Sequence, residues 1–147
     1  MDVIVWVADG TWPATVDAAR RFIPDGAQIA LLHVTEEDVA AAAHGAFAGL
    51  LGRGYSHGLD PGEQVETLSA TAAADLLRAA AARLGRPATQ VERRGRIERE
   101  VVELADGADL LVCARDGDRS RPGPHSLAPP TRFVVDHVRC PVLLVWA

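Results

Sequence analysis

Short apolar runs recur along the chain and alternate with stretches whose apolar residues repeat at helical spacing. Most of the runs are rich in valine, leucine and isoleucine and lack polar alternation, which is typical of strands buried on both faces of a parallel sheet. These runs predict strands at residues 3–8, 28–34, 88–94, 109–114 and 141–146.

Helical patterns occupy the intervals between these runs. Pro13 fits the first turn of a helix, where the missing N–H of proline costs nothing. A second helix is expected to open at Thr35, because the acids that follow suit its positive end. In the longest helix the leucines between Leu68 and Leu84 are expected to share one buried face. Helices are predicted at 13–22, from 35 onward, and at 64–84, 97–105 and 131–137, with a loop over 52–62.

Strands that alternate with helices imply parallel strands joined by crossover helices, and therefore an α/β fold. The chain has 147 residues, of which 48% are hydrophobic. That length supports one well-buried core. We therefore expect a single domain over residues 1–147.

The charge of the chain excludes several function classes. A formal net charge of -5 argues against general binding to nucleic acid or to anionic membranes, because both rest on cationic neutralisation of phosphates. All 15 basic residues are arginines. A phosphate-binding lysine of the P-loop type and a Schiff-base lysine are therefore excluded.

The first residues lack the basic region of a secretory signal, and the longest low-polarity stretch, 39–51, is too short to span a bilayer. A cytoplasmic protein is expected, and its two cysteines should be reduced. Cys113 is placed near the carboxyl end of the fourth predicted strand and Cys140 just before the fifth. Because these positions lie about a strand length apart, two free thiols are predicted.

Five segments, taken in order, resemble the universal stress protein family. None is specific alone, but their order and spacing cover nearly the whole chain. The segments are Asp9-Gly10-Thr11, Leu31-Leu32-His33-Val34, Gly95, Gly107-Ala108-Asp109-Leu110-Leu111-Val112 and Cys140-Pro141-Val142-Leu143-Leu144-Val145.

The resemblance implies an open, doubly wound, Rossmann-like sheet of five parallel strands in the order 3-2-1-4-5, with helices on both faces. Ligands in such sheets bind at the carboxyl ends of the strands where the order reverses, here between the first and fourth strands. The resemblance also places the last strand at the sheet edge, where it would form a homodimer. The residues expected at that interface are Val142, Leu143, Leu144 and Val145.

Many members of the family bind ATP through glycine, two residues, glycine, nine residues, then glycine and serine or threonine. Here Ala114 takes the first position and Gly117 the second, where it is expected to supply one N–H donor. Ala128 takes the third, one residue farther along than the motif expects, and Pro129 replaces the hydroxyl residue. Proline offers neither N–H nor hydroxyl. We therefore expect a degenerate nucleotide crevice that binds ATP weakly or not at all.

Other residues are candidates for what remains of this site. By resemblance, Asp9 would lie near adenine and ribose, and the backbone of Val34 would meet adenine. Arg115 could recruit phosphate by charge, while Ser126 could cap the last helix or meet a phosphate. Thr131, in the predicted last helix, is a further candidate.

No combination of nucleophile, base and orienting group is visible, so no catalytic residue is assigned and an enzyme is not expected. The five histidines lack metal-ligand spacing, so no metal is expected. We expect a non-catalytic regulatory or stress-response protein. Two alternatives stay open: a switch that binds ATP or AMP through an altered loop, and an adaptor that docks a protein partner through the glycine-rich segment 45–62 without nucleotide.

Overall fold

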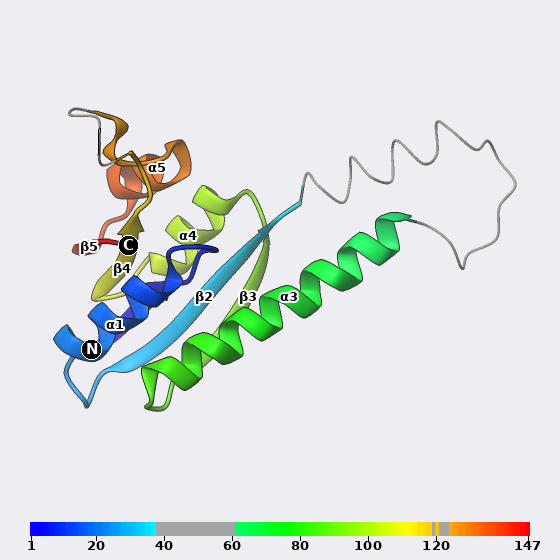
Figure 1. The fold of residues 1–147 in the computed structure, drawn as a ribbon. Coiled ribbons are helices and arrows are strands. Elements are labelled where there is room, and N and C mark those ends of the chain that lie inside the picture. Colours follow the sequence, from blue (N-terminus) through cyan, green and yellow to red (C-terminus); the bar gives the residue numbers. More distant parts are fainter. Residues whose placement is uncertain (38–60, 119, 121–123) are drawn as a thin grey trace, which may run out of the picture.

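The computed structural model describes residues 1–37, 61–118, 120 and 124–147 (Figure 1). The strands are β1 (Asp2–Trp6), β2 (Gln28–Glu36), β3 (Thr89–Gly95), β4 (Leu110–Arg115) and β5 (Val142–Trp146). The α-helices in these residues are α1 (Trp12–Phe22), α3 (Pro61–Leu84), α4 (Ile97–Ala105) and α5 (Pro129–His137), and a short 3-10 helix, η1, covers Pro124–Ser126.

All five strands lie in one parallel sheet in the order β3-β2-β1-β4-β5. β1 is central, with Val5 opposite both Leu31 of β2 and Val112 of β4. This arrangement confirms the open α/β fold and the strand order that the resemblance implied. The chain order reverses between β1 and β4, which places the switch point where it was expected.

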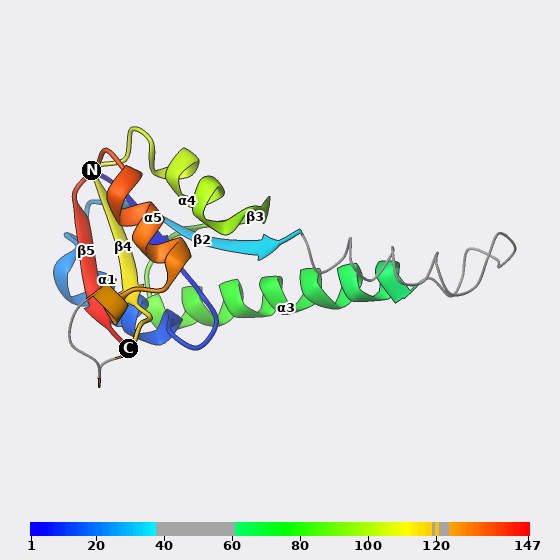
Figure 2. The same cartoon turned by 90° about the horizontal axis from the view of Figure 1, so that it is seen from above.

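Helices cover both faces of the sheet, with α1 and α3 on one side and α4 and α5 on the other (Figure 2). Successive side chains of a strand point to opposite faces. In β1, Val3 and Val5 therefore pack in the cluster under α1 and α3, whereas Ile4 and Trp6 pack in the cluster under α4 and α5. All four are buried, as the apolar run of this strand predicted.

The prediction that a helix opens at Thr35 is wrong. β2 continues through Thr35, which lies opposite Arg94, and ends at Glu36, opposite Gly95. Pairing with β3 satisfies backbone groups of these residues, and that outweighs the local preference of the acids for a helix start. Residues 38–60, which hold most of the glycine-rich segment 45–62, lie outside the described residues.

Two helices begin more than one residue earlier than predicted, and each of these begins on a proline. α3 starts at Pro61 and α5 at Pro129, because proline is favoured at the first helical position. Leu77 and Leu84 are buried as expected, but Leu68 is 70% exposed. Leu68 is nine residues before Leu77, or two and a half turns, so the two point to opposite sides of α3. The other element ends agree with the predictions within two residues. No helix among the described residues is long and apolar enough to cross a membrane.

Candidate functional site

The candidate crevice lies where the neighbouring strands β1 and β4 end. β1 leads into the turn at Asp9 and Gly10, and β4 leads into the loop at Asp116 and Gly117. Gly10 has φ 77°, a conformation that favours glycine. Asp9 is exposed in this turn. Asp9 thus lies at the carboxyl end of the central strand, as predicted, and is exposed to solvent.

His33 and Val34 lie near the carboxyl end of β2, the strand beside β1. Val34 is only 6% exposed and packs in the core under α4 and α5. His33 is buried, and its Nδ1 donates a hydrogen bond of 2.8 Å to the carbonyl of Val7. The Val7 carbonyl lies just beyond the end of β1. The imidazole of His33 gives this carbonyl a hydrogen-bond partner, so His33 has a structural role. Because the Val34 side chain is in the core, only its backbone could face a ligand.

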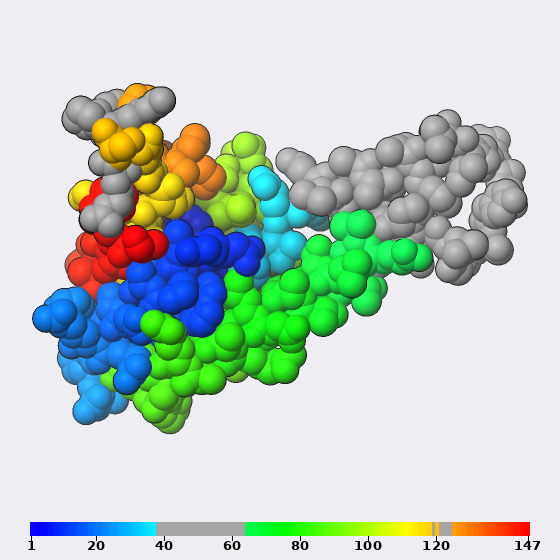
Figure 3. Space-filling model, viewed as in Figure 1, coloured from blue at the N-terminus to red at the C-terminus, as the bar shows by residue number. Residues whose placement is uncertain are grey.

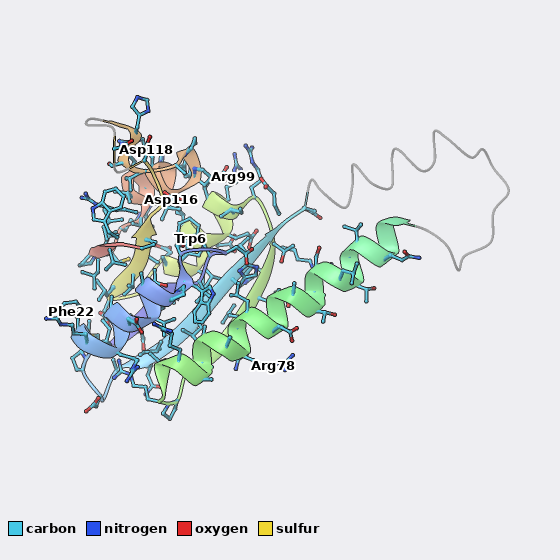
Figure 4. The ribbon with its side chains drawn as sticks, viewed as in Figure 1. Trp6, Phe22, Arg78, Arg99, Asp116 and Asp118 are labelled. Carbon is cyan, nitrogen blue, oxygen red and sulfur yellow. The ribbon has the colours of Figure 1, made fainter. Side chains whose placement is uncertain are left out.

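The positions at which the sequence predicted phosphate contacts are bound by a carboxylate of the chain itself. The backbone N–H of Ala128 donates to Oδ1 of Asp116 at 2.8 Å, and the hydroxyl of Thr131 donates to Oδ2 at 2.7 Å. Thr131 is 1% exposed. Ala128 is the residue before α5 and offers no side-chain cap. Asp116, which lies beside α5 (Figure 4), therefore caps this helix from the start of the connection between β4 and α5.

Gly117 does not offer its N–H to a ligand, contrary to the sequence prediction. This N–H donates to the carbonyl of Ser126 at 3.2 Å, and the N–H of Asp118 donates to the carbonyl of His125 at 3.1 Å. A Cβ on Gly117 would lie 2.0 Å from the His125 carbonyl oxygen. Glycine is needed here because the loop folds closely against η1, and the donor that the motif would supply is already used.

The Arg115 side chain is directed away from the predicted phosphate position, and Ser126 is not the cap of α5. The guanidinium of Arg115 lies over the ring of Trp146, 5.4 Å from its centroid, and the two residues are partners in the β4–β5 ladder. Arg115 is therefore directed toward the edge strand. Ser126 accepts from Gly117 through its backbone, and the cap of α5 that the sequence assigned to its hydroxyl comes from Asp116.

Sequence reasoning missed Asp116, although a signal was present. Pro129 and Pro130 mark a helix start, yet the preceding residue is Ala128, which cannot cap through its side chain. A helix start without a local cap requires a partner from elsewhere. An acid in the loop after β4, beside Gly117, was a suitable acceptor for the free N–H groups of that helix start.

Two of the three carboxylates at this end of the sheet have defined partners. Besides Asp116, the side chain of Asp118 accepts from the N–H of Ser120 at 2.9 Å and from its hydroxyl at 2.6 Å. These hydrogen bonds lower the pKa of Asp118 below its usual value. With Asp9, three acids thus follow β1 and β4, beside Arg115 at the end of β4. Within the described chain, no group of side chains could hold a metal ion.

A separate hollow of about 450 Å³ lies between α4 and α5. Its lining includes Arg99, Val102 and His137, and the His137 ring stacks on Phe133 with centroids 3.9 Å apart. His137 is the last residue of α5, whereas the crevice is at the first turn of this helix. The hollow is therefore distinct from the crevice, and no sequence motif pointed to it.

Both cysteines are free thiols, as predicted. Cys113 lies opposite Leu144 in the β4–β5 ladder, four residues along from Cys140. Burial raises the pKa of the Cys113 thiol to about 12, and the nearby charges of Asp116 and Cys140 add to this rise. Burial also raises the pKa of Cys140. Neither thiol is therefore activated as a nucleophile.

β5 is an edge strand, as the resemblance implied, and lies at the surface beside α1 (Figure 3). Its side chains, however, are half-buried on both faces. Leu143 and Val145 pack against the core under α1 and α3, while Val142 and Leu144 pack under α4 and α5. What β5 offers to another chain is its backbone edge rather than a free apolar face.

Comparison with known proteins supports the same fold. The sequence pattern of the "Universal stress protein family" matches residues 3–145. No curated protein matches the chain in sequence. A crystal structure of a universal stress protein in complex with cAMP is similar, with a TM-score of 0.62 and 19% identity, covering 99% of this chain and 96% of the other.

Two further solved structures are similar at the same identity. Universal stress protein UspA from Lactobacillus plantarum has a TM-score of 0.63 and 19% identity, covering 98% of this chain and 96% of its own. A universal stress protein family protein from Arabidopsis thaliana with AMP bound has a TM-score of 0.59 and 19% identity, covering 99% of this chain and 91% of its own. At this identity these likenesses show the shared fold alone.

Proposed function

The chain belongs to the universal stress protein family, and from that premise we propose that it is a non-catalytic regulatory protein whose nucleotide crevice binds ATP weakly or not at all. The observation that carries this proposal concerns the positions where the family motif would bind phosphate: their N–H donors are already used within the chain. The N–H groups of Gly117 and Ala128 already bind acceptors of the chain, and Pro129 and Pro130 have none.

The expected loss of affinity follows from these donors. A triphosphate needs several converging N–H groups, because each desolvated and unpaired phosphate oxygen is costly. Two missing charge-assisted bonds at about 1.5–3 kcal/mol each weaken binding by roughly a hundredfold or more. Arg115, which is stacked on Trp146, would have to leave that ring to compensate.

Calorimetric titration of the protein with ATP, AMP and adenosine tests this proposal. We expect ATP and AMP to bind no more tightly than adenosine, because only the part of the crevice near Asp9 and Val34 accepts a ligand. ATP binding in the micromolar range that is lost in Arg115→Ala would contradict the proposal. That result would favour the alternative, a switch that binds ATP or AMP, for which the relatives crystallised with cAMP and AMP are the supporting observation.

The absence of catalysis is part of the proposal. The carboxylates of Asp116 and Asp118 accept hydrogen bonds from Ala128, Thr131 and Ser120, so they are committed to holding the loop rather than to activating water. An assay of phosphate release from ATP is expected to show no turnover above the buffer. Turnover that disappears in Asp116→Asn would contradict a non-catalytic role.

We further propose a homodimer through the backbone edge of β5, which an antiparallel copy of the same strand could extend about a two-fold axis. Native mass spectrometry of protein purified without added nucleotide reports subunit count and bound ligand together. A dimer without nucleotide is expected, and a monomer would contradict it. Polar substitution of Leu143 or Val145 is unsuitable as a test, because both pack in the core.

A further inference from the structure

Asp116 is the anion that the first turn of α5 binds. Helix N-termini bind anions through free N–H groups and the helix dipole, and here Ala128 and Thr131 donate to the two oxygens of this one carboxylate. We propose that Asp116 is a specificity-determining residue: it fills the position of a ligand phosphate and restricts the crevice to uncharged ligands of the nucleoside class. This inference rests on the proposed function, whose crevice it concerns.

The backbone on both sides of Asp116 is fixed by hydrogen bonds. β4 ends at Arg115, immediately before it. Immediately after it, Gly117 and Asp118 donate to the carbonyls of Ser126 and His125. The carboxylate is therefore tethered at the helix terminus with a high effective concentration.

An outside phosphate meets two obstacles at this terminus. It must displace the tethered carboxylate from Ala128 and Thr131, and it must then lie beside a like charge that has lost its partners. A nucleoside without phosphate meets neither obstacle, because it brings no charge to this terminus.

A simpler role for Asp116 is that of a helix cap with no effect on ligands. Both roles predict that its removal lowers stability, so stability cannot distinguish them. They differ in what happens to phosphate. If Asp116 excludes phosphate, its removal frees the Ala128 N–H and the Thr131 hydroxyl, and affinity for a phosphorylated ligand rises.

The test is calorimetric titration of AMP and adenosine into wild type, Asp116→Ala and Asp118→Ala. Asp118→Ala is the matched control, because it removes the same charge from the same loop but leaves the contacts of Asp116 in place. In Asp116→Ala we expect AMP to bind at least about tenfold more tightly than in wild type, a gain of about 1.4 kcal/mol. Adenosine affinity should stay unchanged, and Asp118→Ala should behave as wild type.

A second variant covers the case in which Asp116→Ala does not fold. Asp116→Asn keeps the shape of the side chain and removes its charge, so it too is expected to raise AMP affinity. Adding Thr131→Val to either variant should reduce the gain, because the hydroxyl is one of the two freed donors. Circular dichroism of each variant establishes that it is folded before titration.

AMP affinity in both Asp116 variants equal to that in Asp118→Ala would overturn this inference and leave Asp116 as a helix cap only. That result would leave the proposed function intact as long as wild type binds ATP no better than adenosine. Tight ATP binding by wild type would instead overturn the proposed function, whatever the variants do. The two failures are thus distinguishable in one set of titrations.

Discussion

Arg86 links the end of α3 to the end of α1, and its replacement by alanine is expected to destabilise the domain. Its Nη1 donates to the carbonyl of Pro24 at 2.9 Å, and its Nη2 donates to those of Ile23 at 3.1 Å and Ala19 at 3.3 Å. The side chain is only 16% exposed. Ile23 and Pro24 directly follow α1, so their carbonyls are not acceptors within the helix, and a cation at a helix C-terminus also favours the helix dipole.

The magnitude follows from these contacts. Hydrogen bonds to charged groups contribute about 1.5–3 kcal/mol each, so the two shorter bonds contribute about 3–6 kcal/mol. Against this, the Nε of Arg86 is buried without a partner among the described residues, which costs about 1–3 kcal/mol, and water will reach part of the freed carbonyls. We expect Arg86→Ala to lower the free energy of unfolding by about 2 kcal/mol, or the melting temperature by about 4–8 °C.

Urea unfolding of wild type, Arg86→Ala, Arg86→Lys and Arg78→Ala measures this effect. Arg78 is the control, because it is 69% exposed and pairs with Asp75 on the surface of the same helix, where its loss should cost less than about 0.5 kcal/mol. Arg86→Lys should be intermediate, since one ammonium cannot reach three carbonyls as the planar guanidinium does. If the free energies of unfolding of Arg86→Ala and Arg78→Ala differ by less than about 0.5 kcal/mol, the contacts of Arg86 do not stabilise the domain as argued.

Two further predictions concern the thiols and the loop. With a pKa of about 12, Cys113 has a thiolate fraction of roughly one in ten thousand at pH 8, so iodoacetamide should label Cys140 first in the folded protein and both cysteines only in urea. Equal labelling of the two in the folded state would contradict this burial. Gly117→Ala should lower the melting temperature by several degrees, because its Cβ would meet the His125 carbonyl at 2.0 Å. Gly26→Ala, which has open space around it, should not lower it, and equal melting temperatures for the two variants would be incompatible with the loop geometry.

The sequence by itself determined the architecture and the separation of the cysteines. Apolar runs such as Val3 to Val7 are buried on both faces, and the helices between them require parallel strands because only crossovers can join such strands. The order of the strands came from the resemblance to a family. The motif positions also predicted a changed phosphate loop, because Ala114 and Ala128 carry a Cβ where the family motif has glycine, and Pro129 has neither an N–H nor a hydroxyl.

The tertiary structure alone decided which groups Asp116 and Arg86 bind and where β2 ends. Asp116 and Ala128 are 12 residues apart, and Arg86 and Ala19 are 67 apart. Contacts of that separation leave no periodicity or spacing in the sequence, because they depend on which loops the fold brings together. Thr35 likewise reads locally as a helix start, and only pairing with Arg94 of β3 made it a strand residue. Local patterns therefore determined the elements, whereas long-range hydrogen bonds decided the chemistry of the crevice.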